Sequence, residues 1–352
     1  MTFPSGNIDY IANLAELGVV TEESDRRALG LKLFAGEIMT AFFDQVYTEG
    51  RVRSVTINEG ISAQFPHTGI VKGGFHKPGT PITVNETKQA ERIITVDDIV
   101  YASMFFPLQY DLIGHLNFRR EYAEAAAMVL AHSKDTMNFC EIIKAANTAA
   151  LIAGETDGGS VIESDKFKVD ENGADNLEEV AQAIFKAIFA AVDIFDQKKV
   201  PYMNRHMVLR PDYYNLLVWA MMEGGFSLSN ADYMVQRADI NNATLPPIGG
   251  ITIGKSNMLP SSDITGKSAD VNPNQLDTIP THTNHAVDAS KTIGLIWTPE
   301  CVGNVVKQGL AVKQSEELTH LGQLTVAYML MGGGVLRPES AIELKLDTLS
   351  ND

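Results

Sequence analysis

The longest uninterrupted helical pattern in the sequence runs from Phe118 to Ala153. No Gly or Pro occurs inside this stretch, and Gly154 follows it directly, which is typical of a helix that ends at a glycine. Alanines are frequent throughout, and small or apolar residues recur along one line of its surface. At a rise of about 1.5 Å per residue, this helix would be roughly 54 Å long. We expect it to be closely packed along its side by a sheet or by another chain.

Residues 51–100 have the pattern of two strands joined by a long polar connection. Alternating apolar residues flank the turn sequence Asn58-Glu59-Gly60, and residues 93–96, Ile-Ile-Thr-Val, predict a returning strand. Residues 72–81 are rich in Gly and Pro, so they cannot form a core strand. This stretch has too few apolar residues to fold back on a core, and it predicts a protruding hairpin with Pro78-Gly79 near its tip.

The remaining segments mix helices and strands, which favours an α+β fold. In residues 1–50, four apolar residues fall on one helical face, after a beginning that we expect to be a surface arm: Leu29, Leu33, Ile38 and Phe42. A capping-box-like sequence at residues 175–178 begins a helix with an apolar face, made of Val180, Ile184, Ile188, Ala191, Val192 and Phe195.

Further strands are predicted near the middle and the end of the chain. Residues 207–209 are apolar, as in a buried strand, and Pro211 suits the first turn of a helix that ends at Met222. Residues 261–290 are polar and irregular, as in a surface loop. Residues 324–331 and 341–346 predict strands, and the run Gly332-Gly333-Gly334 between them predicts a sharp turn.

The charge balance argues against a dedicated nucleic-acid binder. The formal net charge is -16, and adjacent basic pairs such as Arg119-Arg120 and Lys198-Lys199 are isolated along the chain, whereas such binders need clustered Lys and Arg. An acidic surface repels DNA, which is compatible with merely enclosing it. No apolar run is long enough to span a membrane, and residues 1–10 lack the basic region of a signal peptide. We therefore expect a protein made in the cytoplasm, with Cys140 and Cys301 as buried reduced thiols.

One segment has the letters of a nucleotide-binding loop. Residues 249–256, GGITIGKS, fit the phosphate-loop pattern from Gly249 to Ser256. Such a loop needs a strand before it and a helix after it, so that backbone amides can bind phosphate. Here two prolines precede it, Pro260 follows shortly, and the β-branched centre is itself typical of a strand. We interpret the segment as a strand without a nucleotide site.

No other pattern indicates catalysis, a cofactor or a metal. Among the eight histidines, His282 and His285 are the close pair, and they lie in a polar stretch without cysteine. The common hydrolase and metalloprotease motifs are absent from the sequence. We therefore predict no catalytic, cofactor-binding or metal-binding residues and no cofactor.

Several stretches, taken in order along the chain, resemble one family. They resemble the major capsid proteins of short-tailed phages of the autographivirus type (podoviruses), which share the Hong Kong 97 phage capsid fold. The matching stretches are LKLFAGE at residues 31–37, GISAQFPHTGIV at 60–71, ERIITVDDIVYA at 91–102, FRREY at 118–122, Val200-Pro201 and RPDYY at 210–214, and GGGVLRPESAIEL at 332–344. Residues 1–30 and 261–290 carry no resemblance.

The resemblance implies a division of the chain into five segments. These would be an N-terminal arm and helix (residues 1–50), an extended hairpin loop (51–100), a peripheral domain with a long spine helix (101–159), an axial domain (160–302) and the closing strands of the peripheral domain (303–352). In the family, axial domains meet around the hexamer and pentamer axes, and extended loops reach over neighbouring subunits.

The resemblance also implies a function, which is structural and not enzymatic. The chain would assemble with itself into hexamers and pentamers of an icosahedral virion shell, with a scaffolding protein and a portal protein as partners. The shell would form in the host cytoplasm, involve no membrane, and enclose double-stranded DNA without reading its sequence. Two alternatives stay open: a cytoplasmic nucleotide-binding α/β enzyme that uses residues 249–256, and a prokaryotic nanocompartment shell protein of the same fold.

Overall fold

The computed structural model describes residues 38, 40–42, 46–82, 86–107, 118–169, 177–222, 245–265, 280–317, 319 and 321–347. The chain divides into two compact units. One unit comprises residues 1–46, 99–131 and 309–329, and the other comprises residues 47–98, 132–308 and 330–352. Within the described part, no helix is both long and apolar enough to cross a membrane.

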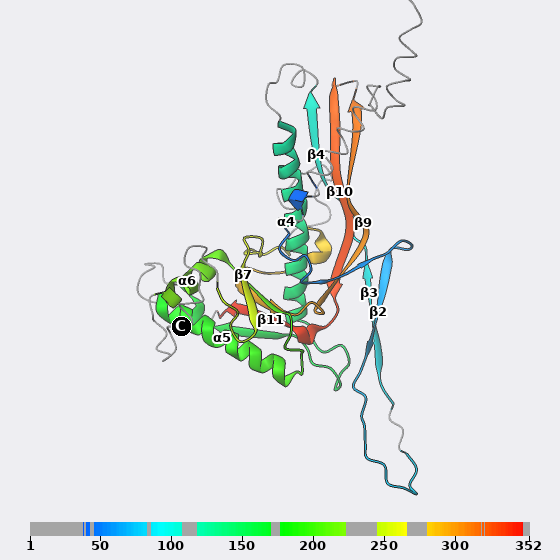
Figure 1. The fold of residues 1–352 in the computed structure, drawn as a ribbon, viewed down its shortest axis with the longest axis vertical. Coiled ribbons are helices and arrows are strands. Elements are labelled where there is room, and N and C mark those ends of the chain that lie inside the picture. Colours follow the sequence, from blue (N-terminus) through cyan, green and yellow to red (C-terminus); the bar gives the residue numbers. More distant parts are fainter. Residues whose placement is uncertain are drawn as a thin grey trace, which may run out of the picture. The chain divides into compact units, whose positions relative to one another are not determined.

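The larger unit is built on a five-stranded mixed sheet (Figure 1). Its strands, in spatial order, are β5 (Ser160–Ser164), β11 (Ala341–Leu346), β8 (Thr292–Trp297), β6 (Arg205–Leu209) and β7 (Ile251–Lys255). β11 is parallel to β5 and antiparallel to β8, and β6 is parallel to β7. The helices α5 (Leu177–Gln197) and α6 (Pro211–Met222) accompany this sheet, and both lie where the sequence predicts them.

Each face of this sheet forms its own hydrophobic core, because successive strand residues point to opposite faces. Met207 and Leu209 pack in one cluster with apolar residues of α5 and α6. Val208, between them, belongs to a second cluster with Trp297 and with Phe139 of helix α4 (Phe118–Ala146). The predicted buried strand at residues 207–209 is therefore confirmed, and the C-terminal part of α4 covers the second face.

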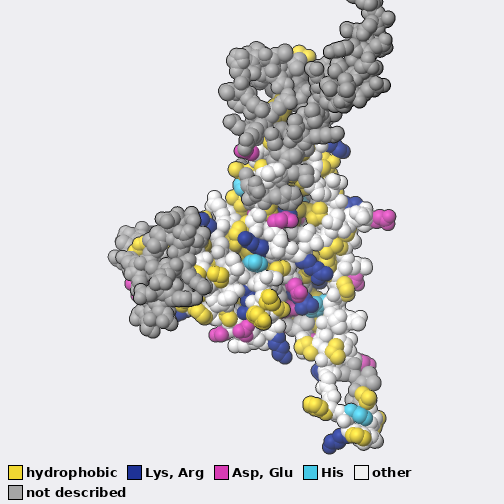
Figure 2. All heavy atoms as spheres, in the orientation of Figure 1, with side chains coloured by type: hydrophobic (Ala, Val, Ile, Leu, Met, Phe, Trp, Pro, Cys, Tyr) yellow, Lys and Arg dark blue, Asp and Glu magenta, His cyan; other side chains and the backbone are white. Residues whose placement is uncertain are grey.

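The predicted hairpin is confirmed as well. β2 (Ser62–Thr68) pairs antiparallel with β3 (Gln89–Thr95), from Ser62 opposite Thr95 to Thr68 opposite Gln89. Beyond these strands, residues 70–82 are exposed, and Gly79 turns the chain with a φ of 88°. Figure 2 shows hydrophobic, Lys and His side chains on the surface of this free end. The short strand β1 (Arg53–Thr56) precedes the hairpin and pairs in parallel with β9 (Val302–Glu317).

The smaller unit contains an antiparallel strand pair. β4 (Val100–Pro107) pairs with β10 (Gly322–Val335) from Val100 opposite Met329 to Pro107 opposite Gly322. These strands belong to a sheet of order β1-β9-β10-β4. In the first segment, Ile38 and Phe42 are helical and buried, as predicted, whereas Leu29, Leu33 and the predicted arm lie outside the described residues.

The long helix ends earlier than the sequence predicts. α4 stops at Ala146, whereas the pattern predicts a helix to Ala153. The amide Nδ2 of Asn147 donates to the carbonyl of Ile143 over 2.9 Å, and Oγ1 of Thr148 donates to the carbonyl of Lys144 over 2.6 Å. These side chains satisfy carbonyls of the last turn, and local side-chain bonds of this kind compete with continuation of a helix.

The glycine run at residues 332–334 is not the sharp turn that the sequence predicts. All three glycines lie inside strand β10. A Cβ on Gly332 would stand 2.1 Å from the carbonyl oxygen of Thr95, and one on Gly334 would stand 3.0 Å from the side chain of Ile94. Glycine is needed here because the end of β3 lies directly against β10.

Candidate functional site

The segment from Tyr47 to Asp97, which carries the β2–β3 hairpin, is called the hairpin segment below. A buried carboxylate fixes its start to helix α4. Asp135 accepts hydrogen bonds from the backbone N–H of Tyr47 (2.8 Å), the backbone N–H of Thr48 (2.9 Å) and the hydroxyl of Thr48 (2.6 Å). Asn138, one turn further along α4, donates to the same hydroxyl over 2.6 Å. Lys134 pairs with Glu49 beside them. Burial raises the pKa of Asp135, and the bonds from Thr48 and Tyr47 oppose that rise.

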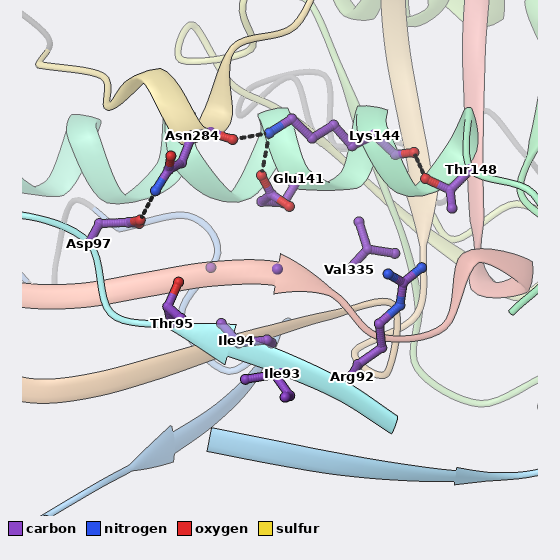
Figure 3. Close-up of a pocket in the computed structure, with 12 residues that line it drawn as sticks. Arg92, Ile93, Ile94, Thr95, Asp97, Glu141, Lys144, Thr148, Asn284 and Val335 are labelled. Carbon is purple, nitrogen blue, oxygen red and sulfur yellow. Dashed lines mark hydrogen bonds and ion pairs between the residues drawn. The ribbon is translucent and has the colours of Figure 1, made fainter. Parts of the chain in front are cut away.

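The end of the hairpin segment is fixed to the same helix through a histidine. His285 lies between two carboxylates: its Nδ1 is 2.7 Å from Oε1 of Glu141 on α4, and its Nε2 is 2.7 Å from Oδ2 of Asp97, directly after β3. Asn284 donates to the other oxygen of Asp97 over 2.7 Å. Lys144 binds Glu141 over 2.9 Å and also the carbonyl of Asn284, as Figure 3 shows.

These contacts keep His285 protonated at neutral pH. Burial alone would lower the pKa of His285, but the hydrogen bonds and charges of Asp97 and Glu141 raise it to about 9. For Asp97, burial acts to raise the pKa, and the bonds from His285 and Asn284 outweigh it, so the net shift is downward. A protonated imidazole donates from both nitrogens, and here each nitrogen faces one carboxylate.

A pocket of about 620 Å³ opens beside this cluster. Figure 3 shows Lys144 and Glu141 on α4 at one side, and Arg92 on β3 pointing toward Val335 of β10. Its lining is mixed in polarity: Arg92, Ile93, Ile94, Thr95, Asp97, Glu141, Lys144, Thr148, Asn284, Gly333, Gly334 and Val335. Ile94 is also buried against Val305 and Leu336, so apolar packing supports the polar attachment.

The segment resembling a phosphate loop is a strand, as predicted. Residues 251–255 form β7, paired with β6, and Gly249 and Gly250 form the turn before it, with φ of 58° and 79°. No described helix follows, since residues 256–265 contain turns and bends. Lys255 is exposed, with its Nζ 5.4 Å from the ring centroid of Tyr214.

We therefore expect Lys255→Ala to leave assembly unchanged. Successive strand residues point to opposite faces, so Gly254, Lys255 and Ser256 cannot converge on one phosphate. The lost contact with Tyr214 should cost at most about 1 kcal/mol of stability. Particle yield after gradient sedimentation measures assembly, and ATP titration by calorimetry measures whether the chain binds nucleotide. Tight ATP binding that disappears in the variant would contradict the strand interpretation.

The two neighbouring histidines have different environments. His282 is partly exposed, and its Nε2 is 3.2 Å from Asp98, whereas the side chain of His285 is 2% exposed. Within the part of the chain that the structure describes, no group of three potential ligands could hold a metal ion. Sequence reasoning missed the contacts of His285, because Glu141 and Asp97 lie 144 and 188 residues away from it.

Solved capsids of phages have the same fold as this chain. The capsid of the cyanophage P-SCSP1u is 27% identical and has a TM-score of 0.67, covering 86% of this chain and 88% of that chain. The mature capsid of bacteriophage PhiM1 is 18% identical, also with a TM-score of 0.67, over 87% and 88% of the two chains. The predicted α+β fold of Hong Kong 97 type is confirmed, and it is the fold of these phage capsid proteins.

Sequence comparison identifies the family. The family model described as Gp10A-like major capsid protein matches residues 64–345. The major capsid protein of Escherichia phage T7 is 26% identical over 332 residues, which cover 92% of this chain and 93% of that protein. The corresponding protein of Enterobacteria phage T3 is 25% identical over 332 residues, covering 93% and 94%. The chain belongs to the Gp10A-like family of major capsid proteins. This membership supports neither the nucleotide-binding enzyme nor the nanocompartment shell protein as an alternative.

Proposed function

We propose that this major capsid protein assembles into hexamers and pentamers of a closed icosahedral shell, in which a portal replaces one pentamer. The exposed hairpin carries this proposal. Large apolar side chains on and around it face solvent within the single chain: Ile61, Ile70, Val71, Phe75, Ile82 and Ile93. Exposed apolar surface of this extent is typical of an interaction site, and a second copy of the chain is the partner that a shell provides.

The five segments given by the resemblance fit this role. Residues 51–100 would be the extended loop that reaches a neighbouring subunit, and residues 1–50 would be the arm. Residues 101–159 and 303–352 would form the peripheral domain with α4 as the spine helix, except that β11 pairs with β5 and β8 of the proposed axial segment. Residues 160–302 would form the axial domain, which contains α5 and α6 and meets its copies around the symmetry axes.

The remaining partners follow from the role of a shell. Scaffolding protein would guide assembly in the host cytoplasm, and the finished shell would enclose double-stranded DNA. The net charge of -16 supports enclosure without sequence-specific contacts. We propose no catalytic activity for the chain, since a structural role needs none.

The proposed function predicts particles from this one chain. Expressed alone or with its scaffolding protein, it should sediment as large assemblies, and electron microscopy should show closed shells. Its exposed apolar hairpin should make a monomeric form poorly soluble at high concentration. A stable, soluble monomer under these conditions would contradict the proposal.

A further inference from the structure

We propose that His285 is a proton-dependent latch that holds the end of the hairpin segment, at Asp97, on helix α4. This inference concerns attachment within one chain, so it stands independently of the proposed assembly. The two ends of the hairpin segment are held by different kinds of hydrogen bond. Tyr47 and Thr48 are held by Asp135 directly, through backbone and hydroxyl donors that keep their protons. Asp97 and Glu141 are both acceptors, and they need a donor between them.

His285 is that donor only while it carries two protons. Its Nδ1 and Nε2 are each 2.7 Å from a carboxylate oxygen, one of Glu141 and one of Asp97. A neutral imidazole has one N–H and one lone pair. After deprotonation, the lone pair of one nitrogen would therefore face a carboxylate oxygen at hydrogen-bond distance. The direct link between Asp97 and Glu141 would be lost, and the longer connection from Asp97 through Asn284 to Lys144 would remain.

The other groups around the cluster do not replace this proton. Lys144 neutralises one charge through Glu141, so Asp97, Glu141, Lys144 and protonated His285 together carry no net charge. Loss of the His285 proton leaves one uncompensated negative charge at a buried position, which is costly. The further charged or titratable groups near the cluster are His282 with Asp98, Arg92 on β3 in the same pocket, and the buried thiol of Cys301 with Glu339.

The direction of the pH dependence follows from the raised pKa of His285. The pKa rises from 6.5, its ordinary value, to about 9 in the closed state. The latch is therefore at full strength below about pH 6.5, weakens as pH rises, and is lost above about pH 9. One proton is involved, so the ratio of the closed to the open state should fall by at most roughly tenfold per pH unit across this window.

Hydrogen–deuterium exchange on the full chain tests the latch. Protection of peptides covering residues 93–98, corrected for the intrinsic pH dependence of amide exchange, should fall roughly tenfold per unit between about pH 6.5 and 9 and then level off. Peptides covering residues 47–50, held by Asp135, are the internal control and should show no such slope. A flat profile for residues 93–98 in the wild-type chain would overturn the proposal.

Three variants separate titration from simple destabilisation. His285→Gln removes the titrating group, so protection of residues 93–98 should be low and independent of pH. In Glu141→Gln the histidine loses one carboxylate, so its pKa should rise less. Protection should then level off at a lower pH than in the wild-type chain, after a smaller total change. His282→Gln is the matched control and should keep the wild-type slope.

If the slope survives in His285→Gln, or disappears in His282→Gln, another group titrates and the latch is wrong. A Glu141→Gln profile that levels at the wild-type pH would equally exclude it.

Discussion

Deletion of residues 72–81 should abolish shell formation while the rest of the chain stays folded. These residues are exposed along their whole length, so their removal takes nothing from either hydrophobic core of the larger unit. Phe75, among the deleted residues, is fully exposed, and Val71 and Ile82, directly on either side of them, are largely exposed. Burying one such side chain in a neighbour is worth roughly 2 kcal/mol, and a shell repeats that contact at every subunit. Electron microscopy and gradient sedimentation measure the loss, and circular dichroism measures folding.

A second variant separates the length of the tip from its chemistry. Replacing residues 72–81 with an equally long Gly/Ser segment keeps the reach of the hairpin and removes Phe75, the large apolar side chain at its tip. This variant should also fail to assemble, because the contact energy lies in the side chains. Normal shells from the deletion variant would show that the hairpin is not the intersubunit contact.

Trp297→Ala should remove much of the stability of the larger unit. Trp297 is 0% exposed, and its Nε1 donates to the carbonyl of Arg51 over 2.9 Å. Its ring meets Phe139 of α4 edge-on, at 6.2 Å between centroids. Truncation to alanine leaves a large cavity between sheet and helix, so we expect a loss of about 3–5 kcal/mol. Urea unfolding of the unassembled chain, followed by circular dichroism, measures the change.

The other tryptophan of the sequence provides the matched control. Trp219 on α6 is 44% exposed, so Trp219→Ala should change the free energy of unfolding by roughly 0.5 kcal/mol, as at other surface positions. Trp297→Phe should be intermediate, because it keeps the contact with Phe139 and loses the bond to Arg51. Equal effects of the two alanine variants would mean that Trp297 is not central to the core.

Local patterns along the sequence predict much of this fold. The Gly/Pro-rich tip between two alternating strands predicts the β2–β3 hairpin, and the absence of Gly and Pro predicts helix α4. These features depend on residues close in the sequence, whose spacing carries the information. The predicted end of α4 was wrong although it also depends on neighbouring residues. Asn147 and Thr148 are compatible with a helix, but here their side chains donate hydrogen bonds to carbonyls of its last turn.

Features that depend on distant residues could not be predicted in the same way. A glycine run suits either a turn or a close approach of two backbones, and only the position of Thr95 decides for Gly332. Residues 261–290 are polar overall, yet Ile264, His285 and Ala289 are buried. Neither Asp97 nor Glu141 lies near His285 in the sequence, so no local spacing points to the cluster.

The two attachments of the hairpin segment also define a lever. Asp135 and Glu141 lie on one helix, six residues and therefore about 9 Å apart. Residues 62–79, fully extended, would reach up to ~55 Å from that short baseline. For a stiff ribbon, a displacement of about 1 Å at one attachment moves the tip by roughly 6 Å. Substitutions at Thr48 or Asp97 should therefore shift the position of Phe75 without touching it. In the proposed shell, the accuracy with which neighbouring subunits meet would then depend on side chains far from their contact.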